Sequence, residues 1–356
     1  MKKICFVINN MGSGGGTERV ALTIINTLAE KGYNITLLNL WKAEEAFFNI
    51  SPSVKVNFLF EYKKSLYKNY FSIVKKLRSF VAEEGFDIVI NVESTLTFFI
   101  TPALLNMGVK HINWEHYNFT ASSGSKIREA SRYVAAWCAD TVVTLTDADA
   151  KLWRQKARPR ATILPINNPM PFEQGEYAYD PDAKVVLSVG RLSHQKGFDY
   201  LLSAWKEVVA NAPGWELKIV GNGEKESDLK QQAKSLGIEN SVTFHSPTKN
   251  IETYYKAAGI YCLSSRFEGL PMVLIEANAY GLPIVAFDCL TGPSDVVQDN
   301  KSGLLAKPED AHDLAQKLTY LITHRDARLK FSEVAYMSAK KFELKTIIKQ
   351  WESLLS

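Results

Sequence analysis

Two glutamates eight positions apart are the most informative chemical feature of the sequence. Glu268 and Glu276 lie in the segment Arg266–Glu276, where Gly269 permits an unusual turn and Pro271 suits the first turn of a helix. Two carboxylates could accept hydrogen bonds from sugar hydroxyls, or act as a general acid and base as in glycoside hydrolases. The alternative is a loop charge followed by an exposed helix residue. The amides expected to face a phosphate at the start of this helix are those of Leu270, Met272 and Val273.

A pair of cations is the second candidate feature. Arg191 and Lys196 lie five residues apart in a loop that begins at Gly190, directly after the apolar run Val185–Val189. A guanidinium supplies a planar fork and an ammonium supplies a point charge, so the two could hold one diphosphate. A solvated surface loop is the alternative, but the position after a strand favours a site.

A glycine-rich loop, Gly12–Arg19, separates the first apolar run from a helical pattern. Its glycines would let the backbone approach a ligand while helix amides point at an anion; the alternative is a tight turn that needs positive φ. A dinucleotide-binding loop is disfavoured for two reasons. Thr17 stands where the third glycine would be, and no acid closes the next strand at Asn39–Trp41.

Short apolar runs alternate with amphipathic patterns, which is typical of parallel sheets with helices on both faces. Strands are expected at Lys3–Ile8, Ile35–Leu40, Asp87–Asn91, His111–Trp114, Thr141–Leu145, Val185–Val189, Glu216–Val220, Ser241–Phe244, Ile260–Leu263 and Ile284–Phe287. Helices are expected at Thr17–Gly32, Phe71–Glu84, Ala148–Arg154, Phe198–Ala210, Ser227–Leu236, Ile251–Ala258 and Met272–Tyr280. Three prolines within 165–171 predict a hinge. The fold class is therefore α/β, with two doubly wound Rossmann-like domains facing across a cleft that would hold a ligand.

Length and composition agree with two globular domains. The chain has 356 residues, 46% hydrophobic and 22% charged, which excludes a disordered chain, a fibre or a small disulfide scaffold. The four cysteines lie in or beside apolar stretches without C-x-x-C spacing, so neither a disulfide framework nor a zinc site is expected. The apolar run Ile4–Ile8 is too short for a signal peptide, and a cytoplasmic protein is expected.

Positive charge is concentrated in the first half of the chain. Residues 1–168 carry a net charge of +7 and residues 169–356 one of −3, which favours an anionic partner. The basic–aromatic segment, Glu61–Phe80, has a net charge of +5 and suits an anionic membrane surface. The alternative is a solvated helix whose aromatic residues enter the core, and no nucleic-acid module accompanies the segment. A second basic cluster comprises Trp153, Arg154, Lys156, Arg158 and Arg160.

Three motifs in order give the chain a family resemblance. G-G-G-T-E-R near the start, G-R-x-x-x-x-K in the second half and F-E-G-L-P-x-V-x-x-E after it resemble family 4 of the retaining glycosyltransferases over essentially the whole chain. The resemblance implies the two-domain GT-B fold and a nucleotide diphosphate sugar as donor. It also implies that a terminal helix crosses back onto the first domain. The expected domains are therefore 1–168 with about 339–356, on the acceptor side, and 169–338, which binds the nucleotide sugar.

The resemblance also assigns roles to residues of this sequence. It implies that Arg191 and Lys196 hold the donor diphosphate, that Glu276 binds the nucleotide ribose, and that Glu268 contacts donor-sugar hydroxyls. The residues it implies as catalytic are Arg191, Lys196, Glu268 and His116. The residues it implies as donor-binding are Gly15, Gly16, Glu115, Gly190, Gly221, Gly223, Thr248, Lys249, Gly269, Leu270, Met272, Val273 and Glu276, with Thr291–Ser294 as a further lining loop.

Asp147 and Asp149 form an Asp-x-Asp pattern, which binds metal in the other common glycosyltransferase fold. Here the pattern opens a helix, so Asp147 is expected to be an N-cap and Asp149 an acid that the helix dipole favours. No metal and no cofactor are expected. Arg191, Lys196 and helix amides would neutralise the leaving group.

The expected reaction moves a hexose or N-acetylhexosamine from a nucleotide diphosphate sugar, with uridine as the expected base, to a polyprenyl-diphosphate-linked or other membrane-bound glycan. Retention by front-face attack is expected, and so is a peripheral position on the inner face of the cytoplasmic membrane. No nucleic acid is expected as a partner. The alternatives are a nucleotide-sugar 2-epimerase on the same fold, a non-catalytic nucleotide-sugar-binding subunit and, least favoured, a pyridoxal-phosphate phosphorylase.

Overall fold

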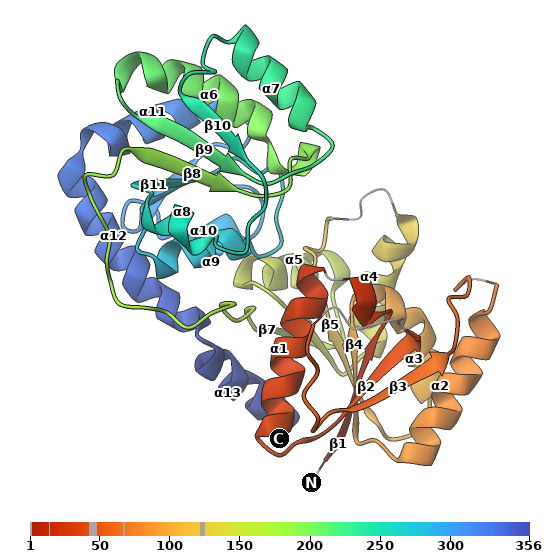
Figure 1. Cartoon of the computed structure of the whole chain (residues 1–356). Coiled ribbons are helices and arrows are strands. Elements are labelled where there is room, and N and C mark those ends of the chain that lie inside the picture. Colours follow the sequence, from red (N-terminus) through yellow and green to blue (C-terminus); the bar gives the residue numbers. More distant parts are fainter. Residues whose placement is uncertain (1, 14, 43–47, 67, 122–124) are drawn as a thin grey trace. The chain divides into compact units, whose positions relative to one another are not determined.

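The computed structural model describes residues 2–13, 15–42, 48–66, 68–121 and 125–356 (Figure 1). Gly14 of the glycine-rich loop and Tyr67 of the basic–aromatic segment lie outside the described residues. The chain divides into two compact units: unit 1 comprises Met1–Pro169 with Leu344–Ser356, and unit 2 comprises Met170–Glu343. Each unit is built on a parallel sheet with interleaved helices, so the predicted α/β class is confirmed.

Unit 1 contains a seven-stranded sheet among its described residues, in the order β3-β2-β1-β4-β5-β6-β7. Its strands are β1 (Lys3–Ile8), β2 (Asn34–Trp41), β3 (Lys55–Phe60), β4 (Ile88–Val92), β5 (Lys110–Trp114), β6 (Thr141–Thr144) and β7 (Thr162–Pro165). All residues of β1 except Lys3 are buried, as expected of a central parallel strand covered on both faces. The strand order reverses between β1 and β4, which makes this pair the topological switch point of unit 1.

Helices cover both faces of the unit 1 sheet (Figure 1). They are α1 (Gly16–Glu30), α2 (Tyr70–Glu84), α3 (Thr97–Leu104), α4 (Lys126–Cys138), α5 (Asp147–Ala157) and α13 (Leu344–Leu355), with single 3-10 turns at Met11–Ser13 and Ser94–Leu96. In α1 the buried residues Val20, Ile24 and Leu28 recur at intervals of four and form the stripe that packs on the sheet. The C-terminal helix α13 packs beside α1, so the end of the chain returns to the unit that contains its start.

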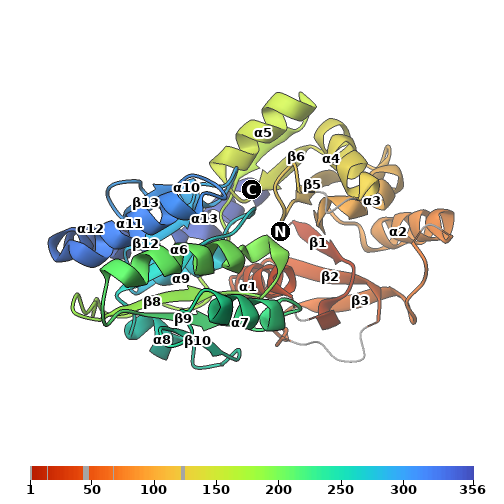
Figure 2. The ribbon, with the colours of Figure 1, turned by 90° about the horizontal axis from the view of Figure 1, so that it is seen from above.

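Unit 2 contains a six-stranded sheet among its described residues, in the order β10-β9-β8-β11-β12-β13. Its strands are β8 (Val185–Val189), β9 (Glu216–Val220), β10 (Val242–His245), β11 (Ile260–Leu263), β12 (Ile284–Phe287) and β13 (Gly303–Ala306). The helices are α6 (Phe198–Asn211), α7 (Glu226–Ser235), α8 (Glu252–Lys256), α9 (Met272–Ala279), α10 (Pro293–Val296), α11 (Ala311–Thr323) and α12 (Arg325–Ala339), with 3-10 turns at His194–Lys196 and Lys340–Phe342. Helix α11 packs on α6 and α12 packs on α9, which lie on opposite faces of the sheet (Figure 2). The switch point of unit 2 lies between β8 and β11.

Three strands escape the sequence prediction, namely β3, β7 and β13. All three are edge strands of their sheets. An edge strand is buried less completely, so its apolar pattern is interrupted: β3 has its first four residues exposed or half-buried, β7 ends in Pro165 and β13 starts with Gly303.

Two helix predictions need correction. Thr146, and not Asp147, is the N-cap of α5, because the Thr146 Oγ1 accepts a hydrogen bond from the Asp149 amide at 3.0 Å. The terminal helix, expected within about 339–356, begins later than expected: α12 ends at Ala339 and α13 begins at Leu344. Among the described residues, no helix is long and apolar enough to cross a membrane.

Candidate active site

The loop after β8 carries the two cations predicted to hold a diphosphate. The Lys196 Nζ lies 2.6 Å from the Glu268 Oε1, and the two side chains are only 19% and 7% exposed. Arg191 is 75% exposed, and its Nη2 lies 3.4 Å from the Glu224 Oε2. The structure therefore brings Lys196 to Glu268, whereas the Arg191 side chain is held by a solvent-screened ion pair with Glu224.

Close backbone packing fixes the course of this loop. Gly197 has φ +60°, and a Cβ at this position would lie 2.0 Å from the Ser264 carbonyl oxygen. The Ser264 Oγ donates to the Lys196 carbonyl at 3.0 Å, and the Arg266 Nη1 donates to the His194 carbonyl at 2.7 Å. The loop after β8 is thus tied to the segment after β11, across the switch point.

The predicted donor-binding glycines after β8 and β9 pack loop against loop. A Cβ on Gly221 would lie 1.9 Å from the Gly190 carbonyl oxygen, and one on Gly223 would lie 2.3 Å from that of Leu192. The Leu192 amide donates to the Asn222 carbonyl at 2.8 Å. Packing alone therefore requires glycine at 221 and 223, and the contact of these residues and of Gly190 with a donor stays a prediction.

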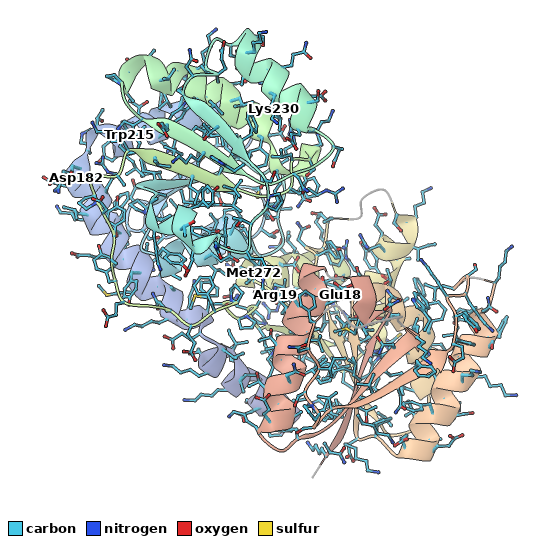
Figure 3. All side chains as sticks on the ribbon, viewed as in Figure 1. Glu18, Arg19, Asp182, Trp215, Lys230 and Met272 are labelled. Atoms are coloured by element: carbon cyan, nitrogen blue, oxygen red, sulfur yellow. The ribbon has the colours of Figure 1, made fainter. Side chains whose placement is uncertain are left out.

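Helix α9 begins at Met272, which Figure 3 marks. Pro271 is its N-cap and not a residue of its first turn, because the Leu274 amide donates to the Pro271 carbonyl at 3.0 Å. The amides of Met272 and Val273 precede this bond and lack a partner within the helix, as at any helix start. Glu268 lies just before the helix, and its carbonyl accepts a hydrogen bond from the Thr291 Oγ1 at 2.7 Å. The segment from Glu268 to Val273, which includes Gly269 and Leu270, therefore leads into the start of α9 beside Lys196, and its binding of a phosphate stays a prediction.

Glu276 lies further along α9 and is held from α8. The Tyr255 hydroxyl donates to the Glu276 Oε2 at 2.7 Å, and Tyr255 is fully buried. Thr248 and Lys249 are exposed on the loop after β10, and among the described residues no hydrogen bond or ion pair links them to Glu276 or Lys196. Their role beside the base stays a prediction.

A pocket of about 340 Å³ opens at the carboxyl ends of β1 and β4, at the switch point of unit 1. It is lined by Ile8, Asn9, Gly15, Gly16, Thr17, Glu18, Val92, Glu93 and Tyr117. Gly15 is the N-cap of α1 with φ −79°, so it does not form the positive-φ turn considered above. A Cβ on Gly16 would meet nothing within 4 Å, which leaves the start of α1 open to the pocket.

Glu115 follows β5 and is buried in a hydrogen-bond network. Its Oε1 accepts from the amides of His116 at 3.0 Å and Tyr117 at 3.1 Å. Its Oε2 accepts from the Ser94 Oγ at 2.5 Å and the Arg132 Nε at 3.3 Å. Both oxygens are occupied and the side chain is 1% exposed, so the geometry favours a structural role over the predicted donor contact.

His116 is held in place by this network. Its ring packs on Trp114 with centroids 4.5 Å apart, and its Nε2 is buried without a hydrogen-bond partner among the described residues. Burial lowers the pKa of His116 to about 3, so the imidazole is neutral at physiological pH. A neutral ring with an unpaired nitrogen could form a hydrogen bond with a ligand, but it is poorly suited to cationic catalysis.

Sequence reasoning missed Glu93, which lies directly after β4 and lines the pocket of unit 1. Its φ is +86°, a conformation that non-glycine residues rarely adopt. The Arg128 Nη2 lies 3.2 Å from its Oε1, and the Arg128 guanidinium stacks on Tyr117. Burial, together with the charge of Glu115, raises the pKa of Glu93. An acid after a predicted buried strand was the signal that could have found it.

The Asp-x-Asp pair is split by the structure. Asp149 is 3% exposed and accepts hydrogen bonds from the Phe119 amide at 2.7 Å and the Trp153 Nε1 at 3.1 Å, whereas Asp147 is exposed at the start of α5. Within the described ranges, no group of three or more His, Cys, Asp or Glu side chains could hold a metal ion. Asp149 therefore ties α5 to the loop after β5.

Comparisons with known proteins identify the family of the chain. A model described as Glycosyltransferase Family 4 matches residues 14–173, and one described as Glycosyl transferases group 1 matches residues 170–337. The chain is also 39% identical to an uncharacterized glycosyltransferase of Haemophilus influenzae, over the full length of both proteins. The chain belongs to the glycosyltransferases. This glycosyltransferase is further 30% identical, over all of its own length, to the amylovoran biosynthesis glycosyltransferase AmsD of Erwinia amylovora, which is also covered in full.

Further comparisons concern a relative whose name gives a lipid-linked glycan, and solved structures with the same fold. A Campylobacter jejuni α-1,4-N-acetyl-D-galactosaminyltransferase, whose name gives a glycan on PP-undecaprenol, is 30% identical over all of this chain and 99% of that protein. The galactosyltransferase WaaB matches with a TM-score of 0.81 at 20% identity, and Anabaena HepE in complex with UDP with one of 0.82 at 20% identity; each match covers 99% of both chains. The resemblance to the GT-B fold predicted from the motifs is thereby confirmed.

Proposed function

We propose that this glycosyltransferase transfers a hexose or N-acetylhexosamine from a UDP-sugar to a polyprenyl-diphosphate-linked glycan during assembly of a bacterial surface polysaccharide. The use of a nucleotide-sugar donor is supported by the cluster at the switch point of unit 2, where Lys196 and Glu268 lie beside the start of α9. HepE, solved with UDP, supports the choice of base, and the PP-undecaprenol in the name of the C. jejuni relative supports the acceptor.

The donor cluster would stabilise a diphosphate leaving group without a metal ion. The Lys196 ammonium has three N–H donors, so it can keep its bond to Glu268 while it reaches a phosphate oxygen. The amides of Met272 and Val273 supply further donors aimed at developing negative charge. Exposed Arg191 is free to swing onto the diphosphate, and Glu276 would accept hydrogen bonds from the ribose.

We assign retention to front-face attack. Glu268 is the carboxylate beside the proposed donor sugar, and its pairing with Lys196 makes it a poor covalent nucleophile. In the proposed step the acceptor hydroxyl oxygen bonds to C1 on the face from which the phosphate oxygen departs. The hydroxyl proton passes to an oxygen of the departing diphosphate, so no protein base is required.

The pocket of unit 1 suits the acceptor sugar. Its lining contains the carboxylates of Glu18 and Glu93 together with Asn9 and Tyr117. Among the described residues, the side chains that line this pocket include two carboxylates and no lysine or arginine, which favours the hydroxyl groups of a neutral sugar over a phosphate. We therefore place the terminal sugar of the glycan acceptor here.

We also propose that the basic–aromatic segment binds an anionic membrane surface. Helix α2 buries Ile73, Leu77 and Val81, while Phe71 at its start is 85% exposed and Tyr62 before it is 81% exposed. Two other aromatic residues of the segment, Tyr70 and Phe80, are partly buried and pack against the core of unit 1. Exposed rings flanked by exposed lysines are the composition of an interfacial anchor. The second basic cluster does not share this character, because Trp153 is fully buried and Arg154 donates to the Ile163 carbonyl.

Co-sedimentation with phosphatidylglycerol vesicles tests this surface. The double variant Tyr62→Ala, Phe71→Ala should lose most vesicle binding, whereas Tyr320→Ala, which removes an exposed tyrosine of unit 2, should bind as the wild type does. Equal binding by all three proteins would overturn the membrane proposal and leave the transfer reaction untouched.

Turnover assays decide between transfer and its alternatives. A panel of UDP-sugars is incubated with the protein, with and without undecaprenyl-diphosphate-linked glycans, and the anomeric configuration of the product is read by NMR. Transfer predicts a new α-linked product from an α-configured donor only when acceptor is present. A 2-epimerase would form a new sugar nucleotide without acceptor, but the saturated Glu115 and neutral His116 are poorly placed for its acid–base steps. A binding subunit would form neither product.

A further inference from the structure

The backbone pairing of the two central strands of unit 2, β8 and β11, ends just before the residues of the donor cluster. The Gly259 amide donates to the Val185 carbonyl at 2.9 Å, and backbone pairing then joins Ile260 with Val186 and Tyr261 with Leu187. Beyond this point side-chain hydroxyls bridge the strands. The Ser188 Oγ donates to the Cys262 carbonyl at 2.8 Å, and the Tyr261 hydroxyl accepts from the Val189 amide at 3.2 Å and donates to the Val189 carbonyl at 3.3 Å. Tyr261 therefore fixes the last residue of β8, from which the loop carrying Arg191 and Lys196 departs.

Tyr261 is one member of a stack of three aromatic rings. Its ring centroid lies 5.9 Å from that of Tyr255 with an interplanar angle of 20°, and Tyr255 lies 5.2 Å from Tyr280 with an angle of 4°. Tyr255 and Tyr261 are both 0% exposed. Burial raises the pKa of both phenols well above its usual value, so each hydroxyl keeps its proton and can donate. The Tyr255 hydroxyl donates to Glu276 and the Tyr261 hydroxyl to Val189.

We propose that Tyr255 and Tyr261 are positioning residues for two different parts of the donor nucleotide. Tyr255 sets the carboxylate of Glu276 for the ribose hydroxyls, and Tyr261 sets the end of β8 for the diphosphate. The ring stack joins both hydroxyls into one rigid support. This inference rests on the proposed function, because it takes Glu276 as the ribose ligand and the loop after β8 as the diphosphate ligand.

The position of Glu276 explains why Tyr255 matters. Glu276 is half-buried on a helix and can adopt several rotamers, and only a fixed rotamer presents its oxygens to a diol at hydrogen-bond distance. Without the hydroxyl, the Glu276 Oε2 would lose a hydrogen bond of 2.7 Å that holds this rotamer. The residue would then turn toward other partners, and binding would lose the preference for a ribose over a deoxyribose.

Conservative variants isolate the hydroxyls from the packing. A cavity of about 240 Å³ adjoins the rings of Tyr255 and Tyr280, so a change of Tyr255 to alanine would enlarge an existing void. Tyr255→Phe and Tyr261→Phe keep the rings. Tyr336→Phe, on α12, is the matched control. It removes a tyrosine hydroxyl that donates to the Gly175 carbonyl, also at 2.7 Å.

The experiment measures dissociation constants by calorimetry on the full chain. The probes are UDP, 2′-deoxy-UDP and UMP, or the matching set for whichever of ADP, GDP, CDP and UDP binds tightest. In the wild type and in Tyr336→Phe, UDP should bind about tenfold more tightly than 2′-deoxy-UDP, a factor that corresponds to one good hydrogen bond. Tyr255→Phe should reduce this ratio to below about threefold. Tyr261→Phe should weaken UDP about tenfold while UMP changes less than about threefold.

The outcomes separate this inference from the proposed function. Because each ratio compares ligands on the same protein, partial unfolding of a variant does not mimic the expected result. If Glu276→Gln removes the ribose preference and Tyr255→Phe keeps it, the positioning role is overturned while the donor site stands. If the wild type shows no ribose preference, or Glu276→Gln keeps it, the proposed ribose ligand itself is wrong. If Tyr261→Phe weakens UMP as much as UDP, the assignment of Tyr261 to the diphosphate fails.

Discussion

Lys196 and Glu268 hold each other at 2.6 Å in a largely buried pair, so neither can be changed without affecting the other. We predict that Lys196→Ala lowers kcat about 10²- to 10³-fold, because it removes a preorganised charge at the leaving group. The structure also predicts a loss of stability of roughly 1–3 kcal/mol, since Glu268 would stay buried without its cation.

Steady-state kinetics at saturating donor and denaturant unfolding measure the two effects of Lys196→Ala. Lys230→Ala is the control, because Lys230 lies exposed on α7 (Figure 3), where it forms an ion pair with its helix neighbour Glu226 and lies 5.9 Å from the centroid of the Phe244 ring. Near-normal turnover of Lys196→Ala would remove the role of Lys196 in leaving-group stabilisation. Unchanged stability would show that Glu268 finds another partner.

Asp149 gives the protein a predicted pH dependence. Burial is the main reason why the pKa of Asp149 is raised to about 7. Its folded-state pKa thus exceeds the unfolded value of about 3.9, so the folded protein binds the extra proton between these two values. Stability from this residue is complete below about pH 4 and falls as the pH rises toward 7, by at most about 1.4 kcal/mol per pH unit.

The variant Asp149→Asn tests this linkage, since an amide keeps acceptor capacity without titrating. Its stability relative to the wild type should increase steadily from pH 5 to pH 7 and level off above pH 8. Parallel stability curves for the two proteins over this range would show that Asp149 is ionised throughout. Asp147→Asn, on the exposed first residue of the same helix, should leave the wild-type curve unchanged.

At the scale of elements, the sequence predicted central strands better than edge strands. Ile260–Leu263 and Ile284–Phe287 agree with β11 and β12 residue for residue, because strands buried on both faces read as continuous apolar runs. The missed helix α11 had a readable signal, since the Asp310 side chain caps it by accepting from the Asp313 amide. Glu115 shows the opposite limit: its burial depends on Arg132, and no local pattern indicates which distant side chain will pair with an acid.

Helix α13 is an element whose removal should damage unit 1. Trp351 is fully buried, with its ring 4.6 Å from that of Trp114, which in turn supports His116. We predict that Trp351→Ala destabilises unit 1 by about 3–5 kcal/mol, the usual cost of deleting a buried indole. It should also reduce activity in the fraction that remains folded, because His116 loses the support of a fixed Trp114.

Thermal unfolding and specific activity measure the effect of Trp351→Ala. Trp137→Ala is the matched control in the same unit, because Trp137 is 47% exposed. It should cost much less stability and leave the activity per folded molecule unchanged. A similar loss in both variants would show that α13 does not support the site.

At the scale of the whole molecule, both units place their candidate residues at a switch point, but the chemistry of the two differs. The switch point of unit 2 has Lys196 and the start of α9, whereas the pocket of unit 1 has Glu18 and Glu93. Motifs predicted the first site, because phosphate binding needs glycines and cations at fixed spacing. They did not predict Glu93, since hydroxyl recognition requires only acceptors that face a pocket, and such acceptors carry no fixed spacing.

This difference predicts which segments of the intact chain a bound nucleotide protects from hydrogen exchange. Hydrogen exchange by mass spectrometry, with UDP at 100 times its dissociation constant, should slow exchange through local opening about 100-fold in the loop 190–197 and in 270–275, because a ligand stabilises the closed state by about 2.7 kcal/mol at this excess. Peptides from β1 to β7 should exchange at their unliganded rates. Lys196→Ala should reduce the protection of 190–197 most strongly. Protection that is confined to the pocket of unit 1 would contradict the placement of the donor, because the nucleotide would then bind among carboxylates instead of the cations and helix amides of unit 2.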